Sequence, residues 1–102
     1  MPTTKEDILH YLSLIKPRLE HDGIEKIGLF GSFASDRADV LSDIDLVIKT
    51  TNQFVVQNRG VKAFLYLEDL RNQLKREFKR EVDLCDESGL QDKSIIESAI
   101  YV

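Results

Sequence analysis

The sequence has one cysteine, no excess of basic residues and no long hydrophobic run. The single cysteine, Cys85, excludes an internal disulfide, and the distant His10 and His21 do not complete a zinc site with it. The 14 Lys and Arg residues are outnumbered by 18 Asp and Glu residues, which argues against DNA binding, because nucleic acids attract positive surfaces. The apolar runs are far shorter than the roughly 20 residues of a membrane span. With no signal-peptide pattern at the N-terminus, these absences predict a cytoplasmic protein.

The composition is that of an ordinary folded domain. Apolar residues make up 42% of the 102 residues and charged residues 31%. Domains commonly have roughly 100–150 residues, so residues 1–102 are expected to form a single domain. A domain of this size hides only about two-thirds of the surface of its unfolded chain. We therefore expect that it does not enclose a large substrate by itself.

Helical periodicity predicts a first helix near the N-terminus. Apolar residues follow one another at steps of three and four, which forms a single stripe. Thr3 and Glu6 fit a capping box at the start of this helix, and Gly23 fits its end. Pro17 lies inside the pattern and predicts a kink or break near Lys16.

The rest of the chain alternates short strands with helices. Strands are expected over 25–30, 43–48 and 81–86, and residues 49–60 are expected to form a mobile loop. A second apolar stripe from Phe64 to Phe78 predicts a helix, and a last helix is expected at about 90–98. The outer face of the second helix is basic and carries Arg71, Lys75, Arg76, Lys79 and Arg80. The order of elements predicts a small α/β (α+β) domain.

Three acidic residues and one turn are the features that carry chemistry. Asp43 and Asp45 are two residues apart on a predicted strand, so they project to the same side with Cα atoms roughly 6–7 Å apart. Two carboxylates this close repel each other unless they are exposed to solvent or a cation lies between them. Asp83, on a neighbouring strand, would complete an oxygen-rich site for one or two Mg²⁺ ions, which suits phosphoryl or nucleotidyl transfer.

The turn at Gly31-Ser32 directly follows the first strand. Glycine lets the backbone approach a phosphate closely, and the following amides and the Ser32 hydroxyl can donate hydrogen bonds to its oxygens. Taken singly, each feature also fits an ordinary turn or a solvated strand end. Their combination at this spacing favours a functional site.

The segment LFGSFASDRADVLSDIDLVI resembles the signature of the polymerase-β-like nucleotidyltransferases. Gly31-Ser32 is followed after ten residues by Asp43-Ile44-Asp45, and the later strand carries Asp83. The likeness covers essentially the whole chain and is strongest to the stand-alone minimal nucleotidyltransferases. It implies their fold, a small mixed sheet packed against helices.

The resemblance also implies roles for individual residues. Asp43 and Asp45 would bind the Mg²⁺ ions that hold a nucleoside triphosphate. Asp83 would bind the catalytic metal and help to deprotonate the attacking hydroxyl. Gly31 and Ser32 would hold the phosphates. Many minimal members are paired with a HEPN-type toxin, and the resemblance implies an antitoxin that transfers AMP from ATP to a tyrosine of that toxin.

One part of the signature differs from its relatives. Where relatives often continue the turn with arginine and glycine, this chain has Ser35 and Asp36. Arg37 is then the residue expected to face the phosphates.

Two other functions stay open at this point. The chain could be a binding module that neutralises a toxin by direct contact with little catalysis. It could also modify a small molecule such as an aminoglycoside, although enzymes of that kind add a substrate-binding domain.

Overall fold

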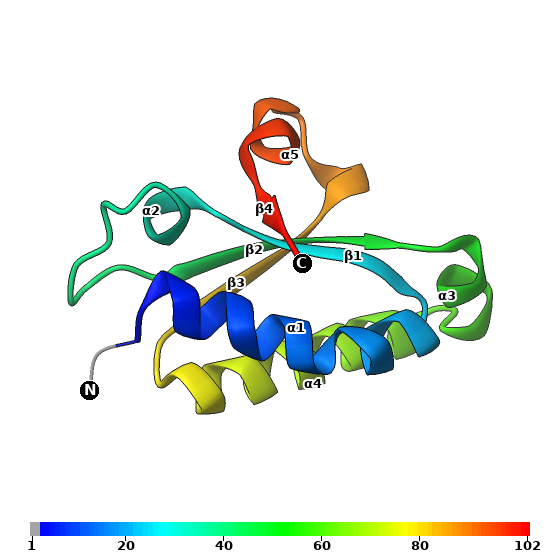
Figure 1. Ribbon diagram of the computed structural model, residues 1–102. Coiled ribbons are helices and arrows are strands. Elements are labelled where there is room, and N and C mark those ends of the chain that lie inside the picture. Colours follow the sequence, from blue (N-terminus) through cyan, green and yellow to red (C-terminus); the bar gives the residue numbers. More distant parts are fainter. Residues whose placement is uncertain (1–2) are drawn as a thin grey trace.

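The computed structural model describes residues 3–102, which form a mixed sheet with its two long helices on one face (Figure 1). The strand order is β3-β2-β1-β4. Strand β1 is antiparallel to β2 and to β4, whereas β2 and β3 are parallel. The elements follow the chain as α1 (Lys5–His21), β1 (Ile24–Phe30), α2 (Gly31–Ala34), β2 (Ile44–Thr50), α3 (Asn52–Gln57), α4 (Val61–Phe78), β3 (Val82–Asp86), the 3-10 helix η1 (Glu87–Gly89), α5 (Ser94–Ser98) and β4 (Ile100–Tyr101). This architecture confirms the predicted fold class.

The hydrophobic core lies between the sheet and the helices α1 and α4. These two helices run side by side under the sheet, and α5 projects on the opposite side (Figure 1). Strand residues alternate between the two faces, so every second side chain of β2 enters the core. The fully buried strand residues on the helix-covered face include Ile27, Leu29, Ile44, Leu46 and Ile48. On the opposite face, β2 carries Asp45 and Lys49 on either side of the fully buried Val47.

Helix α1 begins one residue later than predicted. Thr4, not Thr3, is its N-cap, and the Thr4 hydroxyl accepts a hydrogen bond from the backbone N–H of Asp7 at 3.1 Å. The Asp7 carboxylate accepts in return from the Thr4 N–H, which completes a capping box. The Thr3 hydroxyl instead donates to the carbonyl of Phe78 at 3.0 Å. The predicted capping box of Thr3 with Glu6 was wrong, because the Thr3 hydroxyl is hydrogen-bonded to the last residue of α4.

The break predicted at Pro17 is absent from α1, which continues to His21. Proline removes one backbone hydrogen bond, but Leu12 and Leu19 are fully buried on either side of it. Their burial against the sheet keeps both halves in one helix. The helix ends before Gly23, which has a φ of +99°, as the sequence predicted.

The segment 49–60, predicted as a loop, is ordered. Strand β2 extends to Thr50, and α3 follows it. The Thr51 hydroxyl caps α3 by accepting from the N–H of Phe54 at 3.1 Å, and the Phe54 ring is buried. Most of this segment therefore folds as the end of β2 and as α3, with the Thr51 cap and the buried Phe54 ring, although its sequence has no apolar periodicity.

Two further predictions about helices need correction. The last helix is shorter than 90–98, because α5 spans only Ser94–Ser98; before it, the Asp92 carboxylate accepts from the Ser94 N–H at 3.0 Å. Phe64 lies in α4 as predicted but is 62% exposed, so the buried stripe of that helix begins at Leu70. Among residues 3–102, no helix is both long and apolar enough to cross a membrane.

Candidate active site

Asp45 and Asp83 lie side by side on the open face of the sheet. They are register partners on the parallel strands β2 and β3, whose backbones are about 4.8 Å apart. Ile44 and Leu46, which flank Asp45 along the strand, are fully buried on the helix side. Because side chains alternate between faces, Asp45 must point away from the helices. The pairing of parallel strands thus brings together two residues that are 38 positions apart in the sequence.

Asp43 lies just before β2 and is exposed. Its charge reaches the same cluster, because the pKa of Asp45 is raised by burial, by the charge of Asp83 and by the charge of Asp43, in that order of size. The three predicted carboxylates therefore form one patch of negative potential. In such a patch a bound cation favours the ionised form of Asp45.

The chemistry of these three carboxylates fits Mg²⁺, which prefers oxygen ligands. Within residues 3–102, however, no three His, Cys, Asp or Glu side chains are already arranged around a common metal position. Asp43 is exposed and precedes the regular part of β2, so it is the side chain best able to rotate. The three carboxylates are therefore candidate Mg²⁺ ligands by their chemistry, and they are not grouped around one metal position in this structure.

Gly31 is in direct contact with the carboxylate of Asp45. A β-carbon at position 31 would lie 3.1 Å from the Asp45 Cγ and would collide with its Oδ2. The φ of Gly31 is +75°, a conformation that costs L-residues about 1–2 kcal/mol. Both the close contact and the backbone conformation therefore require glycine here. The turn and the acidic cluster form a single site.

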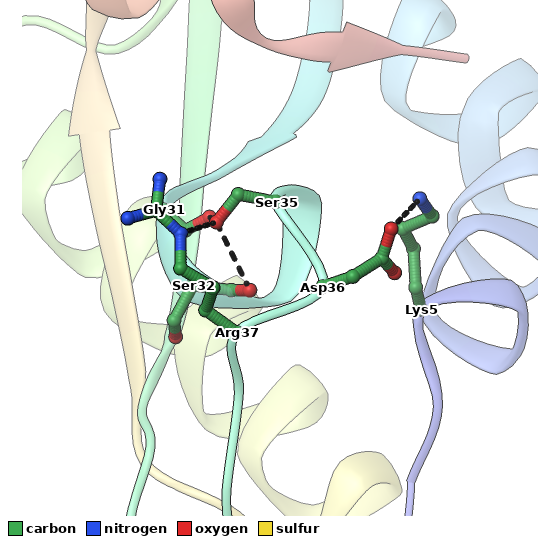
Figure 2. A network of polar contacts seen from close by, with 6 residues as sticks. All are labelled: Lys5, Gly31, Ser32, Ser35, Asp36 and Arg37. Atoms are coloured by element: carbon green, nitrogen blue, oxygen red, sulfur yellow. Dashed lines mark hydrogen bonds and ion pairs between the residues drawn. The ribbon is translucent and has the colours of Figure 1, made fainter.

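We call residues 31–37 the phosphate turn, and a chain of hydrogen bonds stabilises it (Figure 2). The Ser35 hydroxyl donates to the carbonyl of Gly31 at 3.1 Å, and the Arg37 Nε donates to the Ser35 hydroxyl oxygen at 3.3 Å. The Arg37 backbone N–H also donates to the carbonyl of Ser32 at 2.8 Å. Arg37 is thereby brought beside the Gly31-Ser32 segment, and its contact with phosphates stays a prediction.

The Asp36 side chain points away from Gly31 and Ser32, on the other side of the turn from Arg37 (Figure 2). It has a φ of 59°, and its carboxylate pairs with the Lys5 ammonium at 3.2 Å (Figure 2). The left-handed conformation of Asp36 directs its side chain towards α1, while Arg37 returns to the turn. At this departure from the family signature, the carboxylate is therefore directed away from Gly31 and Ser32.

A hollow of about 470 Å³ adjoins the turn, and its lining includes Gly31, Ser32, Ser35, Arg37 and Ser98. This volume is within the roughly 300–1,000 Å³ of ligand sites. Another hollow, of about 400 Å³, lies near α3, but its one carboxylate, Asp22, accepts a hydrogen bond from Tyr66 at 2.8 Å. The hollow at the turn is the candidate substrate site because it adjoins the acidic cluster through Gly31.

Three residues of this region were not predicted from the sequence. Lys5 neutralises Asp36, Ser98 lines the hollow, and Arg80 contacts the segment that joins α2 to β2. Arg80 was assigned only to the basic face of a helix. No local pattern marks these residues, because each reaches the site from a distant part of the chain.

Comparison with known proteins agrees with this geometry. Residues 13–101 match the family model described as polymerase beta, nucleotidyltransferase. A solved structure described as that of a "putative minimal nucleotidyltransferase" superposes with a TM-score of 0.73 at 22% identity, and the match covers 96% of this chain and 95% of the other. A search among curated proteins gave no match. The matched residues include the phosphate turn and all three carboxylates.

Proposed function

This chain belongs to the polymerase beta nucleotidyltransferase family, and on that premise we propose that it transfers a nucleoside monophosphate from ATP to a hydroxyl group of a protein. The observation that carries the proposal is the contact between Gly31 and Asp45, with Asp83 beside Asp45. A turn suited to phosphates and a cluster suited to cations meet at one end of the sheet. Nucleotidyl transfer needs both.

The phosphate turn would bind the triphosphate. Gly31 leaves the backbone open to close approach, and Ser32 offers a hydroxyl donor. Arg37 supplies the positive charge, and its position is fixed by Ser35. The ion pair of Asp36 with Lys5 removes the one carboxylate of the turn that would repel the nucleotide.

Asp43, Asp45 and Asp83 would hold one or two Mg²⁺ ions. When bound, Mg²⁺ neutralises the charge of the triphosphate and stabilises the charge that develops during transfer. The raised pKa of Asp45 supports this assignment, because burial and then the charges of Asp83 and Asp43 disfavour the ionised carboxylate, and a bound cation would offset both effects.

The reaction forms one oxygen–phosphorus bond and breaks another. The acceptor oxygen attacks the α-phosphorus, the bond from that phosphorus to the bridging oxygen breaks, and pyrophosphate leaves. The acceptor proton passes to a carboxylate, and we assign this step to Asp83. Asp83 is exposed on the open face beside Asp45, so an acceptor hydroxyl can reach it.

An acceptor on a protein is supported by the edge of the site. Val40 and Leu41, just before Asp43, are 83% and 87% exposed, and exposed apolar side chains favour contact with a protein surface. The hollow at the phosphate turn has the size of a ligand site for one small molecule. We propose that the acceptor is a tyrosine of a HEPN-type toxin in the cytoplasm and that AMP transfer inactivates the toxin.

The proposal is tested with the purified chain, Mg²⁺, ATP and a purified HEPN-type protein whose gene adjoins that of this chain. Mass spectrometry of the toxin should show one added AMP on a tyrosine. The Asp43→Asn, Asp45→Asn double variant should give no added mass. An unmodified toxin with the wild-type chain, or equal modification by the double variant, would contradict the proposal.

A second candidate function is neutralisation of the toxin by binding alone. It is favoured by the sequence of the phosphate turn, which has Ser35 and Asp36 where relatives often have arginine and glycine. This function predicts that the double variant still protects cells that express the toxin. Loss of protection by a folded double variant supports catalysis instead.

A further inference from the structure

We propose that Arg80 is a positioning residue that holds the phosphate turn and the carboxylate-bearing start of β2 in a fixed arrangement. The inference rests on the proposed function, because it concerns how the nucleotide site is kept ready to bind. The hydrogen bonds of the Arg80 side chain go neither to Gly31 nor to the three aspartates of the site. Arg80 acts through the segment between them.

The Arg80 guanidinium contacts two parts of the connection from α2 to β2. Its Nη1 donates to the carbonyl of Ser42 at 2.7 Å and to the carbonyl of Asp39 at 3.1 Å. Its Cζ lies 5.0 Å from the centre of the buried Phe33 ring, which belongs to α2. One side chain therefore joins α2 to the residue immediately before Asp43.

The segment that Arg80 contacts is a tight turn over residues 39–42. The Ser42 N–H donates to the Asp39 carbonyl at 3.2 Å, and the Leu41 N–H donates to the Asp39 carboxylate at 2.8 Å. The Ser42 hydroxyl oxygen accepts from the Asp39 N–H at 2.9 Å. These bonds lie within the turn itself, whereas Arg80 connects the turn's carbonyls to the corner between α4 and β3.

Arg80 is itself held firmly at both ends. Lys79, the residue before it, is the left-handed cap of α4, with a φ of 56° and a hydrogen bond to the carbonyl of Lys75 at 2.8 Å. The carbonyl of Glu81, the residue after it, accepts from the N–H of Ile44 at 3.0 Å, where β2 begins. The guanidinium therefore extends from a fixed backbone. Its contacts transmit the position of the α4–β3 corner to the active site.

A pre-formed site binds more tightly because less conformational freedom is lost on binding. Without Arg80, the two carbonyls lose their charged donor, and residues 35–43, which lack regular strand structure, gain freedom. The nucleotide would then have to order both the turn and Asp43. We therefore expect that loss of Arg80 weakens nucleotide binding although no nucleotide contact is removed.

The first test measures amide hydrogen exchange without any ligand. Arg80→Ala should speed the exchange of the Leu41 and Ser42 amides and leave those of α1 unchanged. Arg76→Ala is the matched control, because it removes the same side chain from an exposed position of α4. Arg80→Lys keeps a cation that can donate to both carbonyls and should restore most of the protection. Unchanged exchange in Arg80→Ala would overturn the inference, whatever the function of the chain.

The second test measures the binding of Mg²⁺ with an ATP analogue whose α,β-bridge is a methylene group. Arg80→Ala should weaken binding roughly tenfold, the equivalent of one charge-assisted hydrogen bond, and Arg76→Ala should leave it unchanged. If Arg80→Ala does not fold, Arg80→Gln, which keeps most of the side-chain stem and removes the charge, should weaken binding in the same direction. Equal binding by the Arg80 and Arg76 variants would overturn the inference. A wild-type chain that binds no nucleotide would instead contradict the proposed function.

Discussion

The carboxylate of Asp45 occupies the space that a β-carbon of residue 31 would need. This contact joins the end of β1 to the start of β2 across the loop that separates them. It explains why a glycine follows β1 and why the aspartate lies on the second residue of β2. The site depends on this contact. A change at Gly31 or at Asp45 should therefore disturb both the phosphate turn and the acidic cluster.

Substitution of Gly31 by alanine should destabilise the fold and displace Asp45. The positive φ alone costs about 1–2 kcal/mol, and the new methyl group collides with the carboxylate. Chemical denaturation should show the stability loss, and nucleotide titration should show loss of binding. Gly60→Ala is the matched control, because Gly60 also has a positive φ but a β-carbon there would have no atom within 4 Å. It should lose stability and keep nucleotide binding, and a similar binding loss in both variants would contradict the interpretation.

Replacement of Asp45 by asparagine should stabilise the metal-free protein while it abolishes transfer. Like charges on adjacent strands cost roughly 0.2–1 kcal/mol, and the amide removes one of them. Because the pKa of Asp45 is raised, its ionised form destabilises the folded state above that pKa. The gain in the free energy of unfolding should therefore be largest at neutral pH and shrink as the pH falls and wild-type Asp45 becomes protonated. A variant less stable than wild type at neutral pH would contradict this electrostatic interpretation.

Loss of Lys5 should weaken nucleotide binding through Asp36. The ion pair is exposed, so Lys5→Ala should change the stability by no more than about 1 kcal/mol. It frees the Asp36 carboxylate to approach the phosphate turn, and the apparent affinity for ATP should fall. The double variant Lys5→Ala, Asp36→Asn should recover wild-type affinity. If the double variant binds as weakly as Lys5→Ala, then Asp36 is not the cause.

The thiol of Cys85 should react slowly with alkylating reagents. Its pKa is raised by burial and then by the charges of Asp83 and Asp45, so little thiolate is present at neutral pH. Asp83→Asn should lower this pKa and speed the reaction with iodoacetamide, whereas Asp92→Asn, a charge removal outside these causes, should not. Equal rates in wild type and Asp83→Asn would contradict the placement of Cys85 beside the acidic cluster.

Local sequence patterns predicted most of the fold because they follow from local physics. The strands of alternating polarity and the buried end of α4 at Leu70 and Leu74 came directly from periodicity. The capping box was misplaced by one residue, because the choice between Thr3 and Thr4 depends on the contact of Thr3 with Phe78. Residues 49–60 were misread, because a single buried ring at Phe54 leaves no periodic pattern.

The site was predictable only where its residues follow a pattern along the chain. Asp43, Asp45 and Gly31 were chosen as candidates because of their spacing around a strand and the turn before it, although Asp43 lies just outside β2. The role of Arg80 could not be predicted from the sequence, because its two carbonyl partners lie 38 and 41 positions away and any residue can supply a carbonyl. The role of Asp36 depends on its backbone conformation and on Lys5, neither of which a motif can specify.

The most direct test of the proposed nucleotidyl transfer compares two labelled forms of ATP. The purified chain is incubated with Mg²⁺, the HEPN-type acceptor and ATP that carries the label either on the α- or on the γ-phosphate. Transfer of AMP predicts that the acceptor takes up the α-label alone, and that the Asp43→Asn, Asp45→Asn double variant abolishes the uptake. Uptake of the γ-label, uptake of neither label, or α-label uptake that survives the double substitution would contradict it.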